Sequence, residues 1–198
     1  MRLDDLDDGS LDAAARVRRD DAHLVSRVVA GERAAFDALF RRFYPRLRRF
    51  VERVTRRPQL VDEIVNDTLL VVWRKAASYD GTSSVSTWVF AIAYRKSLKA
   101  LKGIDEPVED DPDLHPSLDS RSPESLLLRE ETLLILGDAL ATLSPEQRAV
   151  VELTYFHECG YREIAAILEC PVDTVKTRMF HARRKLRGVL AGQREALP

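Results

Sequence analysis

The stretch from residue 161 to 187 constrains the fold most, because its apolar residues recur at helical spacing on both sides of a short break. Residues 161–168 place Ile164 and Leu168 on one helical face. Pro171 then interrupts the pattern, and a residue without an amide donor suits the first turn of a new helix. Beyond it, steps of four, three and four separate Val175, Met179, Ala182 and Leu186. The pattern predicts a helix-turn-helix, which can place its second helix in the DNA major groove.

The outward face of that second helix carries residue types that can read DNA bases. At about 100° per residue, Phe180 lies opposite Val175 and points away from the core. A ring placed there can meet a thymine methyl, while polar neighbours read base acceptors. Basic residues nearer the helix end suit phosphate, which positions the protein without specifying sequence; they are Arg183, Arg184 and Lys185. An ordinary amphipathic helix with a solvated basic side is the alternative interpretation.

Charge is segregated along the chain, although the net charge is only −1. Residues 24–103 hold 16 basic and 7 acidic side chains, a balance of +9. Residues 104–131 hold 2 basic and 10 acidic side chains, a balance of −8. The basic block suits a polyanion, and the acidic block either shields it or imitates one.

Several classes of protein are excluded by what the sequence lacks. No apolar run approaches the roughly 18 residues of a membrane helix, and the acidic N-terminus has no secretory signal, so we expect a cytoplasmic protein. The 8 glycines form no phosphate loop, and the 4 histidines are scattered. Cys159 and Cys170 form no Cys-x-x-Cys pair, which argues against a metal site. We therefore expect no enzyme activity, no cofactor and no bound metal.

Apolar periodicity predicts an all-α chain of two small helical domains joined by an acidic flexible linker, the C-terminal one containing the helix-turn-helix. Helices are expected over residues 33–55, with Pro45 bending or dividing it, 59–76 and 86–102. The chain divides into residues 1–23, an acidic and disordered tail; 24–103, the first domain; 104–128, the proline-rich acidic linker; and 129–198, the second domain.

Two helical faces of the first domain suggest binding surfaces. On residues 59–76, the side opposite the apolar stripe is acidic and carries an outward Leu70, which indicates a docking site for a basic protein partner or else a solvated face. On residues 86–102, one stripe holds cations below an exposed Trp88 and Ile92. Such a stripe suits unstacked or single-stranded nucleic acid. The alternative is a tryptophan packed on a neighbouring helix above a solvated basic edge.

The chain resembles the bacterial RNA polymerase sigma factors of the extracytoplasmic-function (ECF) subfamily. The resemblance covers residues 24–190 and rests on three segments in a fixed order. These are VDEIVNDTLLVVWRKAASYD, STWVFAIAYRKSLKALK and LSPEQRAVVELTYFHECGYREIAAILECPVDTVKTRMFHARRKLR. It implies that residues 24–103 form sigma region 2 and residues 129–198 form sigma region 4, joined by a linker that threads through the polymerase cleft.

The resemblance also implies a role for each candidate surface. Docking on the clamp helices of the core polymerase largest subunit falls to Asp62, Glu63, Asn66, Asp67 and Leu70. Capture of the minus-10 element as the strands separate falls to Asp80, Ser83, Ser84, Trp88, Arg95, Lys96 and Lys99. Recognition of the minus-35 duplex falls to Lys176, Thr177, Arg178, Phe180 and His181, with Arg183 and Arg184 on phosphate.

The expected function is therefore promoter-specific transcription initiation with core RNA polymerase. Promoter DNA and core polymerase are the expected partners, and an anti-sigma factor is a plausible third. The alternative is a helix-turn-helix regulator that binds duplex DNA without polymerase. The acidic docking face and the Trp88 stripe favour the first function, because a plain regulator needs neither.

Overall fold

The computed structural model describes residues 5–103, 137 and 139–194. This described part is helical and contains no strand, so the predicted all-α fold is confirmed. Its elements, in chain order, are α1 (Asp5–Val29), α2 (Arg33–Thr55), α3 (Pro58–Arg74), the short 3₁₀ helix η1 (Ala76–Ser78), α4 (Val85–Lys102), α6 (Pro145–Tyr155), α7 (Tyr161–Ile167) and α8 (Val172–Arg194). None of these helices is long and apolar enough to cross a membrane.

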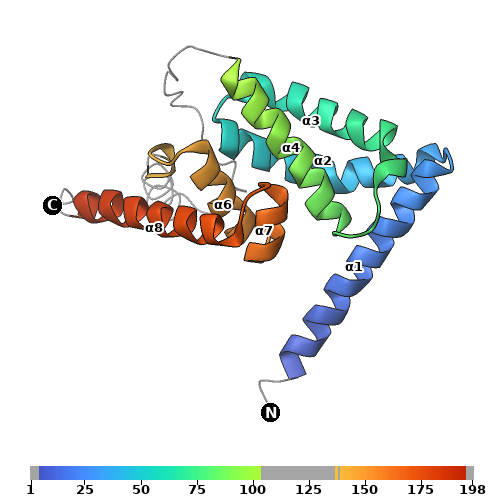
Figure 1. Cartoon of the computed structure of the whole chain (residues 1–198), viewed down its shortest axis with the longest axis horizontal. Helices are drawn as coiled ribbons and strands as arrows, with labels where there is room; N and C mark the ends of the chain where they lie inside the picture. Colours follow the sequence, from blue (N-terminus) through green and yellow to red (C-terminus); the bar gives the residue numbers. More distant parts are fainter. Residues whose placement is uncertain (1–4, 104–136, 138, 195–198) are drawn as a thin grey trace, which may run out of the picture.

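The described chain has two halves, a first half from α1 to α4 and a second half from α6 to α8. The first half is built on α2, which α1, α3 and α4 contact (Figure 1). Its three- and four-residue apolar steps bury Leu39, Phe43, Leu47 and Phe50 almost completely. α2 runs through Pro45 as one helix, so the expectation that Pro45 divides it was wrong. A proline within a helix removes one backbone hydrogen bond. The packing of α2 on four helices, α1, α3, α4 and α6, holds it in place here.

Two helix starts follow from local side-chain chemistry. Ser84 begins α4 by accepting a hydrogen bond at its hydroxyl from the Thr87 amide, 3.0 Å away. Ser144 begins α6 with a capping box, in which the side chains of Ser144 and Gln147 each bond the other's backbone amide. Pro145 takes the first helical position. The Leu-Ser-Pro-Glu-Gln sequence predicts this start, and the structure bears it out.

The N-terminal segment differs from the expectation of a disordered tail over residues 1–23. α1 begins at Asp5 and runs without a break to Val29. Asp21 is buried, with 3% of its surface exposed, and forms an ion pair with Arg42 of α2. Arg18 pairs with Glu163 of α7 across 2.8 Å. The segment looks disordered by composition because it is highly charged. Its charged side chains have partners on distant elements, α2 and α7, which composition does not reveal. The predicted linker, residues 104–128, lies outside the described residues, as does most of the stretch from 129 to 138.

The two halves pack directly on each other, α6 against α2 and α7 against α4 (Figure 1). Their buried side chains form one continuous hydrophobic cluster. Polar groups also cross the boundary: the Arg148 guanidinium donates to the carbonyl of Val54 from Nε at 3.1 Å and from Nη2 at 2.9 Å. The sequence predicts both halves but not this contact, because apolar periodicity reveals a buried face without revealing its partner.

Phe50 joins the two halves, so its truncation should destabilise them together. Its ring centroid lies 5.1 Å from that of Phe90 on α4 and 6.2 Å from that of His157, which follows α6. Phe50→Ala should lower the free energy of unfolding by about 3–5 kcal/mol, through lost burial and the cavity it leaves. Urea denaturation measures this. Phe180→Ala, at a side chain 62% exposed, should change stability by less than about 0.5 kcal/mol; equal effects would contradict the packing.

Candidate nucleic-acid and protein interfaces

The outward face of α8 presents an exposed aromatic ring among polar side chains. Phe180 is 62% exposed, and its ring meets that of His181 edge-on at 5.5 Å between centroids. One turn earlier, Lys176 Nζ lies 3.0 Å from an Asp173 carboxylate oxygen. The Thr177 hydroxyl donates to the Asp173 carbonyl at 2.9 Å. The helix therefore holds its polar residues in defined positions around a ring that contacts solvent.

The basic residues of α8 divide into two groups. Arg183 and Arg184 are exposed, and Arg183 donates to the Tyr155 hydroxyl at 2.9 Å while lying 5.9 Å from the centre of that ring. Arg178 is half-buried instead, with its guanidinium 3.6 Å from Cys170 Sγ and its charge acting on Tyr94 of α4. Arg178 thus faces the junction of the two halves, unlike the other residues predicted to meet the minus-35 element.

A shallow cavity of about 320 Å³ lies beside this face, between the first turns of α6 and α8. Its lining combines amide, hydroxyl, carboxylate and cationic groups: Gln147, Asp173, Thr174, Thr177, Arg178 and His181. A helix-turn-helix meets a DNA backbone and its groove through such polar groups.

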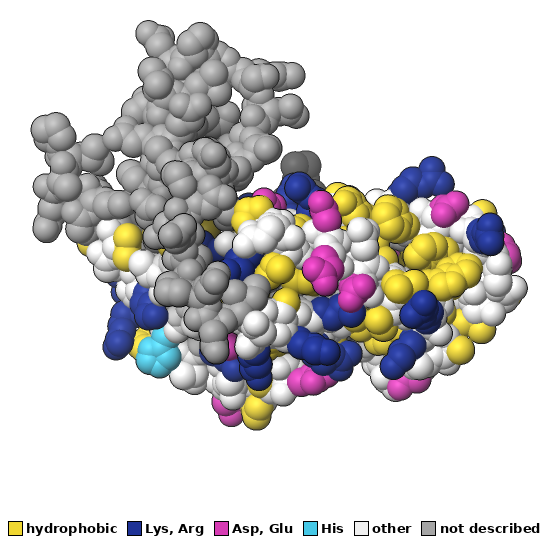
Figure 2. Space-filling view, turned by 90° about the horizontal axis from the view of Figure 1, so that it is seen from above, with side chains coloured by type: hydrophobic (Ala, Val, Ile, Leu, Met, Phe, Trp, Pro, Cys, Tyr) yellow, Lys and Arg dark blue, Asp and Glu magenta, His cyan; other side chains and the backbone are white. Residues whose placement is uncertain are grey.

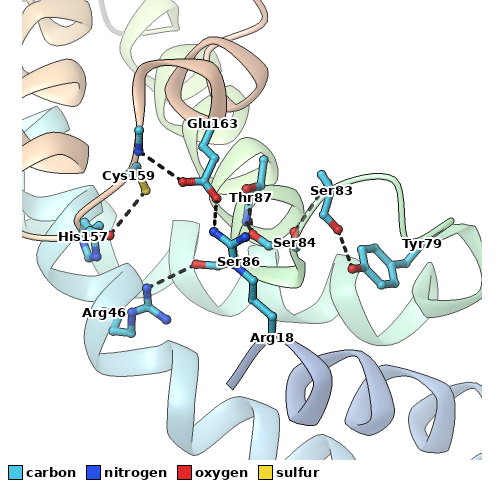
Figure 3. Close-up of polar contacts among 11 residues, drawn as sticks. Arg18, Arg46, Tyr79, Ser83, Ser84, Ser86, Thr87, His157, Cys159 and Glu163 are labelled. Carbon is cyan, nitrogen blue, oxygen red and sulfur yellow. Dashed lines mark hydrogen bonds and ion pairs between the residues drawn. The ribbon is translucent and has the colours of Figure 1, made fainter. Parts of the chain in front are cut away.

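The loop between η1 and α4 is fixed by its own hydrogen bonds. The Tyr79 hydroxyl donates to the Ser83 carbonyl at 2.6 Å (Figure 3). Asp80 accepts from the amide of Thr82 at 2.9 Å and from its hydroxyl at 2.7 Å, and these bonds lower the pKa of Asp80. Gly81 adopts a φ of +75°, which glycine tolerates without strain. Asp80 and Ser84 therefore fix the conformation of the loop, which is already ordered in the free protein.

The stripe on α4 is only partly exposed. Ile92 is 6% exposed and belongs to the core, so the expectation of an outward isoleucine was wrong. Trp88 is half-buried and tilts against Tyr79, with 5.4 Å between ring centroids. Lys99 is exposed, Lys96 reaches Asp67 of α3 at 2.8 Å, and Arg95 forms an ion pair with Glu169 in the turn after α7.

The outer face of α3 has the character that the sequence predicts. All five residues expected to dock on polymerase are exposed, and Leu70 retains 42% of its accessible surface; they are Asp62, Glu63, Asn66, Asp67 and Leu70. Asp62 has neighbours on α2, the hydroxyl of Tyr44 at 3.3 Å and Arg48 Nε at 3.7 Å. Acidic, basic and hydrophobic side chains lie side by side in the view from above (Figure 2). The face therefore offers both charge and an apolar contact.

A second cavity, about 570 Å³, opens between α1, the loop before α4 and α7. Arg18 and Arg19 of α1 line one side, and Arg162 and Glu163 of α7 line another. The loop contributes its hydroxyl-rich residues: Tyr79, Thr82, Ser83, Ser84 and, at the start of α4, Thr87. α1, whose first part the sequence analysis expected to be a disordered tail, thus forms one wall of this cavity.

A buried polar cluster at the junction also escaped sequence reasoning. The Glu152 carboxylate accepts from Arg53 at 3.0 Å, and its other oxygen lies 3.9 Å from His157 Nε2. Burial raises the pKa of Glu152 to about 7, although Arg53 and Arg49 act in the opposite direction. Burial, assisted by the arginines, lowers the pKa of His157 to about 4. No sequence motif marks this cluster, because Arg53 and Glu152 belong to different halves of the chain.

In the described residues, no group of three or more histidine, cysteine, aspartate or glutamate side chains is arranged to hold a metal ion. Cys159 and Cys170 are free thiols, and burial raises the pKa of Cys159 to about 11.

Comparison with known proteins shows the family to which this chain belongs. Residues 39–105 match the family model described as Sigma-70 region 2, and residues 133–186 match Sigma-70, region 4. The ECF RNA polymerase sigma factor RpoE of Cereibacter sphaeroides is 31% identical over 79% of this chain and 86% of its own length. The chain belongs to the ECF family of RNA polymerase sigma factors. Sigma factors are not enzymes; they direct RNA polymerase in transcription initiation.

Other sigma factors extend the comparison. The sigma-H factor of Pseudomonas aeruginosa is 27% identical over 84% of this chain and 91% of its own. The solved structure of RpoE from Bartonella quintana, in complex with the anti-sigma factor NepR, matches with a TM-score of 0.61 at 25% identity, covering 79% of this chain and 96% of that one. CnrH, solved with the cytosolic domain of CnrY, matches at a TM-score of 0.65 and 22% identity, covering 87% and 98%, and supports the fold.

The Glu152–His157 cluster of this sigma factor predicts two opposing effects of pH on stability. The raised pKa of Glu152 makes its contribution fall as pH rises from 4.5 to about 7. The lowered pKa of His157 makes its contribution rise between about pH 4 and 6.5. Glu152→Gln should therefore leave a stability that rises by about 1.4 kcal/mol per pH unit over that range.

His157→Phe should leave the opposite slope, and the wild type should be flatter than either variant. Urea denaturation across a pH series measures all three. Identical pH profiles for the three proteins would contradict the cluster.

Proposed function

We propose that this sigma factor reads promoters in two parts, the minus-35 element as duplex through α8 and the minus-10 element as an opened strand through α4 and the loop before it. The sequence boundaries assign the first domain, residues 24–103, to polymerase docking and the minus-10 element. They assign the second, residues 129–198, to the minus-35 element. The acidic linker would lie in the polymerase cleft, and the protein would act in the cytoplasm.

The observation that carries the proposal is the exposed Phe180 ring on α8. The ring is 62% exposed and contacts His181. It therefore leaves apolar surface in water, which is unfavourable in the free protein and is relieved when a partner covers the ring. Lys176 and Thr177 lie on exposed positions one turn earlier. This is the combination that recognises a base edge in the major groove, apolar contact with a thymine methyl beside polar donors. Arg183 and Arg184 are exposed nearer the end of the helix, where they suit phosphate.

The exposed acidic face of α3 supports docking on core RNA polymerase. Carboxylates attract a basic partner over distance and set orientation, while Leu70 supplies an apolar contact at close range. Asp67 is engaged with Lys96, so docking would free this lysine for DNA.

The minus-10 assignment rests on the loop and on α4. The loop is held by its own hydrogen bonds, and Trp88 offers a half-buried ring beside it. Stacking of an unpaired base on such a ring, with cations nearby for phosphate, is the usual way that proteins bind single strands. Arg95 and Lys99 are the exposed cations of this surface.

Regulation by an anti-sigma factor is part of the proposal. The similar RpoE of Bartonella quintana was solved in complex with the anti-sigma factor NepR. A corresponding partner would bind this chain and keep it from polymerase.

Loss of the α8 reading residues should separate promoter recognition from polymerase binding. In the Lys176→Ala/Phe180→Ala variant, the holoenzyme should lose at least about 30-fold in minus-35-dependent transcription, as expected for two base contacts of about 1–3 kcal/mol each. Affinity for core polymerase should not change. Run-off transcription and a core-binding assay measure the two quantities. Loss of core binding in this variant would contradict the assignment.

Charge reversal on α3 should have the converse effect. The Asp62→Lys/Glu63→Lys/Asp67→Lys variant should bind core polymerase at least about 10-fold more weakly, because attraction becomes repulsion. Glu32→Lys/Asp37→Lys/Glu158→Lys serves as a control, because it makes the same change in net charge at three exposed carboxylates outside α3. Fluorescence titration with labelled core polymerase measures the affinity; an unchanged dissociation constant for the triple variant would sink the docking proposal.

A further inference from the structure

The two glutamates at the ends of α7 each hold an arginine of the other half of the molecule. Glu163, in the first turn, accepts from Arg18 of α1 at 2.8 Å, and Figure 3 shows Arg18 reaching toward it past Ser84 and Thr87. Glu169, just after the helix, pairs with Arg95 of α4. Both arginines border the surface assigned above to the minus-10 strand. α7 therefore presents its carboxylates where the surface has its cations.

The carboxylates of Glu163 and Glu169 bind Arg18 and Arg95 in the way that a DNA phosphate would. Guanidinium groups bind both anions through the same fork of N–H donors. The 570 Å³ cavity between α1, the loop and α7 brings Arg18, Arg19 and Arg162 around the loop hydroxyls, with Glu163 at its edge. A carboxylate of the chain itself, that of Glu163, therefore lies beside the arginines of a cavity that borders the minus-10 loop.

The backbone at Glu169 gives independent support. The amide of Cys170 bonds the Ala165 carbonyl at 3.1 Å, the bond that closes a helix C-terminus when the intervening residue is left-handed. Glycine usually fills that left-handed position. Here Glu169 fills it with a φ of +50°, which is uncommon for a residue other than glycine, asparagine or aspartate. The turn alone does not call for glutamate, whereas a carboxylate for Arg95 does.

We propose that Glu163 and Glu169 stand in for DNA phosphates on the minus-10 surface, and that Arg18 is a further DNA-binding residue which, like Arg95, exchanges a carboxylate for a phosphate when α7 moves away. The inference rests on the proposed minus-10 role of α4 and its loop. Because the competing carboxylates are in the same chain, their effective concentration is high, and the free protein should bind single-stranded DNA weakly. Separation of the two halves would then free the minus-10 surface, whereas the α8 face around Phe180 is already exposed.

The test uses the full-length chain and a fluorescent single-stranded DNA of mixed sequence, at one fixed ionic strength. Glu163→Gln removes the charge but keeps a side-chain oxygen that accepts from the Gly160 amide, as Glu163 does at 3.2 Å, so the start of α7 keeps this bond. Glu169→Gly removes the charge and relieves the left-handed backbone. The double variant should bind DNA about 2- to 30-fold more tightly than the wild type, the range expected when two exposed ion pairs no longer compete.

A matched control removes the same charge elsewhere. Glu32→Gln/Asp37→Asn neutralises two exposed carboxylates near the connection of α1 and α2, where Glu32 forms a comparable exposed pair with Arg27. A gain in DNA affinity equal to that of this control would overturn the proposal. Adding Arg18→Gln and Arg95→Gln to the α7 double variant should abolish its gain; retained tight binding would overturn the role of these arginines.

Transcription with core polymerase distinguishes this inference from the function on which it rests. The α7 double variant should support transcription as the wild type does, since on this proposal the two halves are already separated when the protein is bound to polymerase. Normal transcription without the gain in DNA affinity would overturn the phosphate-mimic proposal alone. Failure of the wild-type protein to support transcription would overturn the proposed function instead.

Discussion

The packing of α6 on α2 is the contact on which the arrangement of this sigma factor depends. It joins the two halves through one hydrophobic cluster and orients α7 against α4. The contact also contains polar groups, because Arg53 and Glu152 form an ion pair across it and Arg148 donates to the Val54 carbonyl. Desolvation offsets much of the energy of a buried ion pair, so such groups fix geometry more than they add stability. A junction of this kind fixes one arrangement of the two halves, which is called closed below. Separating the halves should cost less free energy than it would for a wholly apolar junction.

Closure accounts for several features that look unrelated when each half is considered alone. Arg95 and Arg178 were both expected at DNA, yet one pairs with Glu169 and the other is half-buried at the junction. In contrast, Phe180 and the acidic face of α3 remain exposed. The structure thus hides part of the proposed minus-10 surface and leaves the proposed polymerase-docking face and the Phe180 ring accessible. Docking on polymerase can therefore precede the exposure of the strand-binding surface.

Sequence reasoning predicted what depends on local periodicity and failed where distant partners decide. Helical spacing was enough to place the helix-turn-helix and the outward direction of Phe180, and the Leu-Ser-Pro-Glu-Gln sequence was enough to place the cap at Ser144. It placed Ile92 outward because the apolar stripe of α4 was drawn too narrowly for a helix packed on several neighbours, which buries residues around more of its circumference. It took the first 23 residues for a disordered tail because Asp21 and Arg18 find their partners on α2 and α7. The Glu152 cluster and the contact between the halves involve residues about 100 positions apart, which no pattern within one segment can reveal.

The central claim is that this chain is a promoter-reading subunit of RNA polymerase with two separate recognition surfaces. Its most direct test is transcription by purified core polymerase and this protein on a library of promoters randomised in both elements. Sequencing of the transcribed templates should yield two conserved blocks at a fixed spacing, and the Phe180→Ala protein should lose the upstream block alone. Transcription without sequence preference, or loss of both blocks in that variant, would contradict the account.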